Sequence, residues 1–316
     1  MNRTIPLINL EHYLNGDSPQ KEKFVENLGH AFQNIGFVGV ESHGISKALI
    51  QDFYTAAKAF FSLPEETKRE YEIPGLAGQR GYTSFGKEHA KHSRIADLKE
   101  FFQIGQTVID KDAIKSEYPD NVLVEEIPGF TELAKHLYQA FEKTGAHLLK
   151  AIAAYLALSD NYFDDKIHNG NSILRAIHYP PIIQEPDSAI RAEQHEDINL
   201  ITLLVGASAG GLQILDKDGV WLDIIPGNDE IVVNVGDMLQ RLTNNYLKST
   251  THRVVNPPKQ EWHIPRLSIP FFLHPRSEMD LSCLKECVNN TNPLAYEPIT
   301  AGKYLDERLR EIGLKK

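Results

Sequence analysis

The stretch QHEDINLITLLV, residues 194–205, sets a histidine and an aspartate two positions apart in front of an apolar run. Side chains two apart on an extended strand project to the same side, so His195 and Asp197 can reach one common point. Gln194 and Glu196 would then point the other way. Because such His-x-Asp pairs occur by chance in many chains, this one is weak evidence alone. A metal site requires a third ligand from elsewhere.

The best candidate for the third ligand is His252, which lies in STTHRVVNP on another predicted strand. Two imidazoles and one carboxylate leave coordination positions open, which is the ligand pattern of non-haem Fe(II) oxygenases. In PRLSIPFFL, Arg266 and Ser268 are again two apart, so a guanidinium and a hydroxyl share one face and can clamp a carboxylate. That carboxylate could belong to a bound dicarboxylic acid or to an acidic side chain of the protein.

The sequence after about residue 170 differs in composition and pattern from the part before it. Seven short runs rich in Val, Ile, Leu and Thr are separated by Gly, Pro, Asn and Asp, which predicts a closed or two-sheet β structure. Helical periodicity marks residues 19–37, 46–71 and 128–158, with Pro64 interrupting the second, and returns at 300–313. We therefore expect one compact α+β unit with an α-rich N-terminal region, a β core and a C-terminal helix.

Composition disfavours several classes of partner. The 316 residues carry a formal net charge of -10 at pH 7 without a Lys/Arg-rich run, so nucleic acid is a poor candidate. The longest apolar stretch, AIAAYLAL, is far shorter than the roughly 20 residues of a membrane span. We see no signal peptide and expect a cytoplasmic protein without a membrane partner, monomeric in the absence of a coiled-coil pattern. Cys283 and Cys287 are expected to be free thiols.

The phrases LRAIHYPP, QHEDINLITLLV, EIVVNVGDMLQRLTNNYLKSTTHRVVNP and PRLSIPFFLHP resemble, in this order, the 2-oxoglutarate/Fe(II)-dependent dioxygenases of the isopenicillin N synthase-like group. IPLINL, NIGFVGVESHGI and FFSLPEETK are similar to that group's N-terminal region, so the resemblance covers nearly the whole chain. It implies an N-terminal α/β region of the non-haem dioxygenase type at residues 1–120. It also implies that residues 121–316 hold a double-stranded β-helix (jelly-roll) core, at about 170–275, with flanking helices.

The same resemblance implies the chemistry of the metal. Fe(II) would be held by His195, Asp197 and His252, with 2-oxoglutarate and O2 as cosubstrates. The implied reaction oxidises a small-molecule substrate, most often by hydroxylation, and releases succinate and CO2.

Further residues match positions of that group around the cosubstrate. Arg266 and Ser268 would bind the C5 carboxylate of 2-oxoglutarate, and Tyr179 would hydrogen-bond the same end. Arg175 matches a basic position near the cosubstrate, and Phe272 matches an aromatic residue that lines the pocket.

The segment QRGYTSFGKEHAKHSRIADLKEFF, residues 79–102, is Gly-hinged and locally basic within an acidic protein. In the group that this chain resembles, the corresponding segment approaches the mouth of the active site. One hypothesis is that Arg80, Lys87 or Arg94 contacts an anionic substrate. The competing interpretation is a solvated basic loop.

Three alternatives to the dioxygenase stay open from the sequence. An oxidase of the isopenicillin N synthase type would use no 2-oxoglutarate, and Arg266 with Ser268 would clamp a substrate carboxylate instead. A non-catalytic jelly-roll protein would keep the metal for structure alone. A zinc hydrolase would need a general base near the open coordination position, and Glu196 points away from the metal if residues 195–197 are extended.

Overall fold

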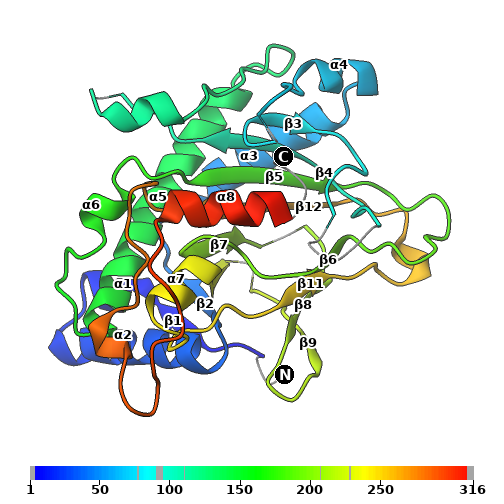
Figure 1. Cartoon of the computed structure of the whole chain (residues 1–316). Helices are drawn as coiled ribbons and strands as arrows, with labels where there is room; N and C mark the ends of the chain where they lie inside the picture. The colour runs from blue at the N-terminus through cyan, green and yellow to red at the C-terminus, as the bar shows by residue number, and fades with distance from the viewer. Residues whose placement is uncertain are drawn as a thin grey trace.

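The computed structural model describes residues 4–76, 78–89, 95–109, 111–206, 208–227 and 229–311 (Figure 1). Two β-sheets form its centre. The larger sheet contains, in spatial order, β1 (Leu7–Asn9), β2 (Phe37–Glu41), β10 (Glu230–Val235), β7 (Ile201–Val205), β12 (Arg266–Leu273), β5 (Ile173–Tyr179), β4 (Glu100–Gly105) and β3 (Gly81–Thr83). The smaller sheet contains β6 (Ala192–His195), β11 (His252–Val254), β8 (Leu212–Leu215) and β9 (Trp221–Asp223).

Helices surround the larger sheet. They are α1 (Leu10–Leu14), α2 (Ser18–Asn34), α3 (Lys47–Phe61), α4 (Glu65–Glu70), α5 (Phe130–Tyr155), α6 (Asp164–Ile167), α7 (Asp237–Leu242) and α8 (Ala301–Glu311). Short 3-10 turns lie at Ala113–Glu117, Lys259–Glu261 and Lys285–Cys287. As the sequence predicts, Pro64 separates α3 from α4, because it stands at the N-cap of the second helix.

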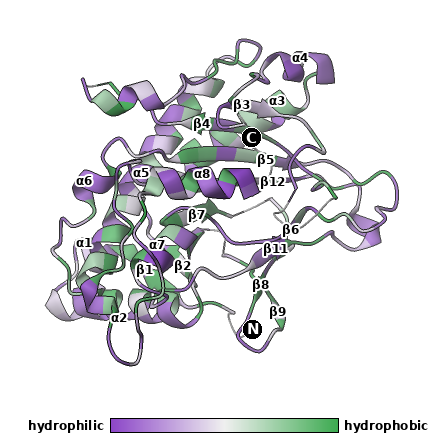
Figure 2. Cartoon of the chain, viewed as in Figure 1, coloured by the Kyte–Doolittle hydropathy of each residue, from purple (hydrophilic) through white to green (hydrophobic). Residues whose placement is uncertain are grey.

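The long helix α5 covers one face of the larger sheet, where it contacts β4, β5, β7 and β12. Its Phe141 stacks on Phe271 of β12 with ring centroids 5.4 Å apart, and Tyr138 meets the same ring edge-on. Figure 2 shows that the central strands of this sheet are hydrophobic, whereas α8 is mostly hydrophilic. Because Tyr138, Phe141 and Phe271 all belong to the main apolar core, the face of the larger sheet that α5 covers is part of that core.

The side chains of strand β12 lie alternately on the two faces of the larger sheet, because successive residues of a strand point to opposite faces. Leu267, Ile269, Phe271 and Leu273 belong to the core that the helices cover. Arg266, Ser268, Pro270 and Phe272 line a cavity on the opposite face. A second, smaller apolar cluster joins the two sheets there, with members from both, among them Phe37, Ile177, Leu212 and Val254.

The predicted class is confirmed, an α+β protein with a jelly-roll core, α-rich N-terminal elements and a C-terminal helix. Seven strand runs are expected after residue 170, and the described part of the chain has eight strands there, because the short polar strand β6 has no apolar pattern to mark it. The extended stretch expected to carry both His195 and Asp197 ends at His195. Residues 1–120 and 121–316 both contribute strands to the larger sheet.

Two smaller features bear on the expectations about thiols and membranes. Cys283 and Cys287 are both free. Within the described ranges, no helix has the length and apolar character that crossing a bilayer requires.

Gly29 of α2 tests the packing of α2 against α5. A Cβ at this position would lie 2.1 Å from Cδ2 of Tyr155, so the ring would have to move. Alanine favours a helix over glycine by about 1 kcal/mol, but overpacking costs about 1–3 kcal/mol. We expect Gly29→Ala to lower the free energy of unfolding by up to about 2 kcal/mol in urea denaturation. In a Tyr155→Ala background the same change should be neutral or stabilising, and an equal loss in both backgrounds would contradict this account.

Candidate metal centre

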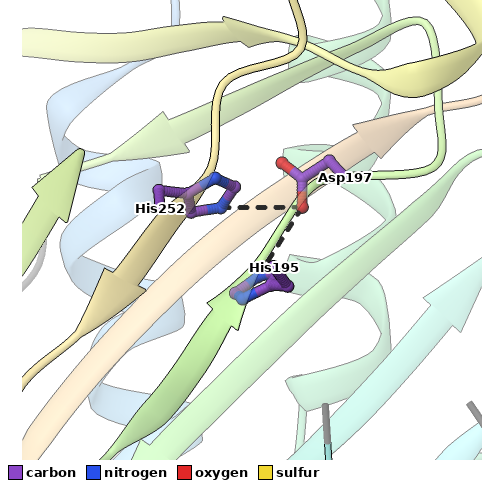
Figure 3. A group of neighbouring side chains, drawn as sticks. All are labelled: His195, Asp197 and His252. Atoms are coloured by element: carbon purple, nitrogen blue, oxygen red, sulfur yellow. Dashed lines mark ion pairs between the residues drawn. The ribbon is translucent and has the colours of Figure 1, made fainter. Parts of the chain in front are cut away.

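Two histidines meet across the smaller sheet. His252 begins β11 and pairs directly with His195 at the end of β6 in the antiparallel register, so one rung of the sheet carries both imidazoles. Asp197 follows β6 by two residues. Its Oδ1 lies 4.0 Å from Nε2 of His195 and 3.8 Å from Nε2 of His252 (Figure 3). One ligand atom from each residue lies within 4.8 Å of the other two, so a single ion can contact all three.

Backbone carbonyls set the orientation of both imidazoles. Nδ1 of His195 lies 2.7 Å from the carbonyl oxygen of Glu193, and Nδ1 of His252 lies 3.1 Å from that of Thr250. A carbonyl can only accept a hydrogen bond, so each Nδ1 carries the proton and each Nε2 keeps its lone pair. Burial, followed by the neighbouring His252, lowers the pKa of His195, which favours the neutral form that binds a metal.

Asp197 is buried and held by two donors. Its Oδ2 accepts hydrogen bonds from the Thr202 hydroxyl at 2.6 Å and from the Asn234 amide at 2.8 Å. Burial by itself would raise the pKa of Asp197, but His252, His195 and the two donors together hold it below its usual value. The carboxylate is therefore ionised at neutral pH, and its Oδ1 faces the two Nε2 atoms. Two imidazoles and one carboxylate suit Fe(II).

A cavity of about 650 Å³ opens beside these three residues. Strands β4, β5 and β12 of the larger sheet form one wall, strands β6 and β11 form another, and α8 contributes side chains at the side. Figure 1 shows α8 in red, drawn between β5 and β7 and nearly parallel to β5 in this view. The lining residues that concern the argument below are Arg175, Tyr179, Arg266, Ser268, Phe272 and His274.

Arg266 is buried at one end of this cavity. Its Nε donates to the carbonyl oxygens of Ala209 and Gly210 at 3.1 and 3.2 Å, and its Cζ lies 5.0 Å from the ring centroid of Tyr179. Its Nη1 is buried without a hydrogen-bond partner. No carboxylate in the described part of the chain lies within ion-pair distance of this guanidinium. A buried arginine without an internal anion fits a ligand that brings its own carboxylate.

Comparison with known proteins identifies the family. Residues 170–275 match the 2OG-Fe(II) oxygenase superfamily, and residues 5–126 match the N-terminal region described for non-haem dioxygenase in morphine synthesis. The 2-oxoglutarate-Fe(II) type oxidoreductase ppzD of Metarhizium majus is 30% identical over 97% of this chain and 95% of its own length. This chain belongs to the 2-oxoglutarate/Fe(II) oxygenase superfamily.

Solved structures share the fold of this oxygenase. A 2OG-Fe(II) oxygenase family protein from Caulobacter crescentus is 42% identical with a TM-score of 0.89, covering 98% of this chain and 100% of that one. A full-length Neurospora crassa protein in complex with alpha-KG, which is 2-oxoglutarate, is 31% identical with a TM-score of 0.87 and covers 98% of both chains. The enzyme uses Fe(II), 2-oxoglutarate and O2, and His195, Asp197 and His252 form its iron-binding site.

Arg175 and Phe272 of the oxygenase both line the cavity. The Arg175 guanidinium lies 4.1 Å from the ring centroid of Phe101 and 5.3 Å from that of Phe272. Its Nε donates to Gln103 at 2.6 Å, and its Nη1 pairs with Glu88 at 3.2 Å. Arg175 is thus a fixed and already paired cation in the cavity wall.

The structure does not place Arg80 or Lys87 in this cavity, contrary to the hypothesis that they contact a substrate. Arg80 is 1% exposed, and its guanidinium packs so closely on Gly105 that a Cβ there would meet its Cζ at 1.9 Å. Lys87 is exposed and pairs with Glu72 at 2.6 Å. The lining of the cavity therefore gives the hypothesis about these two residues no support. Arg94 lies outside the described residues.

A buried ionic cluster in the cavity wall escaped the sequence analysis. Nζ of Lys99 lies 2.7 Å from a carboxylate oxygen of Glu88 and 2.7 Å from one of Asp97. Burial would raise the pKa of Glu88, but Arg175 and Lys99 lower it to about 2. Glu88, Asp97 and Lys99 belong to the segment 79–102 and Arg175 joins them from β5, so these two acids and two cations neutralise one another. Sequence spacing alone carries no signal for such pairing across strands.

The hydrogen bond from the Thr202 hydroxyl to Asp197 can be tested by its effect on metal binding. Valine at position 202 keeps the shape of threonine but removes the hydroxyl that holds Oδ2 of Asp197. Loss of such a supporting bond weakens metal binding about 10- to 100-fold. We expect this loss for Thr202→Val when Mn(II) or Fe(II) is titrated into the apo enzyme. Thr202→Ser keeps the hydroxyl and should bind as the wild type does; equal affinity of all three would contradict the role assigned to Thr202.

His274 gives a test of pH dependence. It is 8% exposed, and burial lowers its pKa from 6.5 to about 4. Between these two values the unfolded chain binds a proton that the folded chain does not, so stability falls as pH falls from 6.5 towards 4. The size is roughly 3 kcal/mol at the acid end of this window. Urea denaturation of the metal-free protein should show a smaller acid loss for His274→Gln, and parallel curves for the two proteins would refute the assignment.

Proposed function

We propose that Arg266, Ser268 and Tyr179 hold the distal carboxylate of 2-oxoglutarate, and that the enzyme hydroxylates a small molecule bound beside the iron. The observation that carries this proposal is the charge pattern of the cavity. Among the described residues, four with cationic side chains line it: Lys99, Arg175, Arg266 and Arg308. Lys99 and Arg175 pair with Glu88, and Arg308 pairs with Glu311 at 3.0 Å. Among these described cations, Arg266 is left for the carboxylate of a ligand.

The register of the larger sheet supports this assignment. Arg266 of β12 stands directly opposite Tyr179 of β5, and Ser268 stands opposite Ile177. Directly opposed residues of an antiparallel pair share one face and lie within side-chain reach of each other. A guanidinium N–H, a phenol and a hydroxyl therefore converge at one end of the cavity, which suits the two oxygens of a carboxylate.

The iron, when bound with 2-oxoglutarate and O2, supplies the oxidising power for attack on a C–H bond. The protein's part is to hold and to orient. His195 and His252 present their Nε2 lone pairs, since Glu193 and Thr250 fix the tautomers. Arg266 fixes the far end of the cosubstrate. The cavity walls then keep bulk water away from the reacting centre.

The substrate belongs in the part of the cavity that Arg175 and Phe272 line. Because Glu88 neutralises Arg175, this wall offers hydrogen bonds and aromatic surface without a spare positive charge. We therefore favour a small polar substrate without a required carboxylate over the anionic substrate first considered. We further propose a monomer that acts in the cytoplasm, on the strength of the composition alone.

The alternatives make different use of the same residues. An oxidase that needs no 2-oxoglutarate would hold a substrate carboxylate on Arg266, and oxygen uptake would then produce no succinate. A zinc hydrolase would need Glu196 as a base, but the Glu196 carboxylate accepts a hydrogen bond from the Thr251 hydroxyl. A non-catalytic protein would bind the metal and consume no oxygen. One succinate formed for each O2 consumed supports the proposal against all three.

Arg266→Gln tests the anchor directly. Charge-assisted hydrogen bonds contribute roughly 1.5–3 kcal/mol each, so we expect the dissociation constant for 2-oxoglutarate to rise about 10- to 100-fold. Binding is followed anaerobically by the visible charge-transfer band of the Fe(II) chelate. The matched control is Arg253→Gln on β11, since Arg253 stacks on Trp221 at 3.9 Å and bonds Gln213 instead of lining the cavity. Unchanged 2-oxoglutarate affinity in Arg266→Gln would exclude this anchor.

A further inference from the structure

A second buried arginine lies near the end of the cavity where Arg266 is found. Arg191 is 1% exposed, and it directly precedes β6. Arg191 stands at a bend one residue before β6, and its guanidinium lies against the ring of Tyr179 on β5. Its Nη2 donates to the carbonyl oxygen of Ile264 at 2.9 Å, whereas its Nε is buried without a partner.

Arg191 and Arg266 share one neighbour, Tyr179. The guanidinium carbons lie 6.0 and 5.0 Å from its ring centroid. Burial, and then the positive charge of Arg266, lower the pKa of Arg191 to about 10. Glu261 acts on Arg191 only from beyond ion-pair distance, and no other described carboxylate forms an ion pair with either arginine. Each of the two also keeps one buried N–H nitrogen without a partner.

Two buried like charges without an anion are costly, because each loses its hydration and each repels the other. The arrangement becomes favourable when an anion enters between or beside them. The cavity end at Tyr179 is the place where an anion from solvent can arrive, since Tyr179 and Arg266 both line it. Arg191 does not line the cavity, so it would act on that anion from behind the phenol.

We propose that Arg191 is a second cationic positioning residue for 2-oxoglutarate: it stabilises the distal carboxylate through its charge and holds Tyr179 beside Arg266. This inference rests on the proposed function. It adds a residue that does not contact the ligand, since Arg191 does not line the cavity. The charge of the pair Arg191 and Arg266, and not Arg266 alone, would then set the preference for a dicarboxylate.

The test compares two ligands that differ only at the far end. 2-Oxoglutarate carries the distal carboxylate, and 2-oxopentanoate has the same carbon chain without it. Both are titrated by calorimetry into the Mn(II)-loaded enzyme, which binds but does not turn over. For Arg191→Gln we expect about tenfold weaker binding of 2-oxoglutarate, with 2-oxopentanoate unchanged within about twofold. Arg191→Lys keeps the charge and should recover most of the preference.

Arg80→Gln is the matched control. Arg80 is as buried as Arg191, burial also lowers its pKa to about 10, and two of its nitrogens also lack partners. Its guanidinium packs on Gly105, which pairs with Ile173 at the opposite end of β5 from Tyr179. It should leave the preference between the two ligands intact. If Arg191→Gln does not fold, Arg191→Met replaces it, because an apolar side chain of similar length avoids a buried unpaired amide.

The outcomes separate the two proposals. A wild-type enzyme that binds both ligands equally would overturn the carboxylate anchor itself. A selective wild type whose selectivity survives in Arg191→Gln or Arg191→Met would overturn the role of Arg191 alone. Equal weakening of both ligands in these variants would also overturn it, since that result indicates a purely structural arginine. Loss of selectivity that Arg191→Lys restores supports the inference.

Discussion

The alternation of side chains along β12 is the constraint on which the rest of this structure depends. One strand in the middle of the larger sheet sends Leu267, Ile269, Phe271 and Leu273 into the helix-covered core. It sends Arg266, Ser268, Pro270 and Phe272 into the cavity. A shift of register by one residue would exchange the two sets, burying a guanidinium among phenylalanines. The same register of β12 therefore sets both the packing of α5 and the position of Arg266 in the cavity wall.

The metal centre depends on a second pairing, that of β6 with β11. This pairing sets His195 opposite His252, and carbonyl oxygens of the same two segments hold both rings by Nδ1. The third ligand comes from the turn after β6 and is supported by Thr202 of β7 and Asn234 of β10. The smaller sheet thus supplies the imidazoles, whereas the larger sheet supports the carboxylate. The site needs both sheets in their observed relation.

Sequence reasoning reached the class of fold because apolar runs between turn residues mark the strands. It reached the metal triad by joining the pair His195 and Asp197 to the distant His252, a choice that the resemblance to a known family supported. The role of Arg266 and Ser268 stays a prediction. Sequence reasoning could not show which cations are already neutralised. Arg80 and Lys87 look alike in sequence, but one is buried against Gly105 and the other pairs with Glu72 at the surface. Arg191 lies four residues before His195, but nothing nearby in sequence shows that it shares the Tyr179 ring with Arg266. Partners across strands are decided by register, which single-sequence patterns do not encode.

The buried cluster of Glu88, Asp97, Lys99 and Arg175 has a consequence for how this enzyme can diverge. Its two carboxylates and two cations cancel, and removing one member of such a cluster typically costs about 3–5 kcal/mol because another is left unpaired. A single substitution in this cluster therefore destabilises the folded protein, whatever its effect on substrate specificity. A change of substrate specificity at these four positions therefore requires paired substitutions that keep the charges balanced. The uncharged positions around Phe272 can be substituted one at a time.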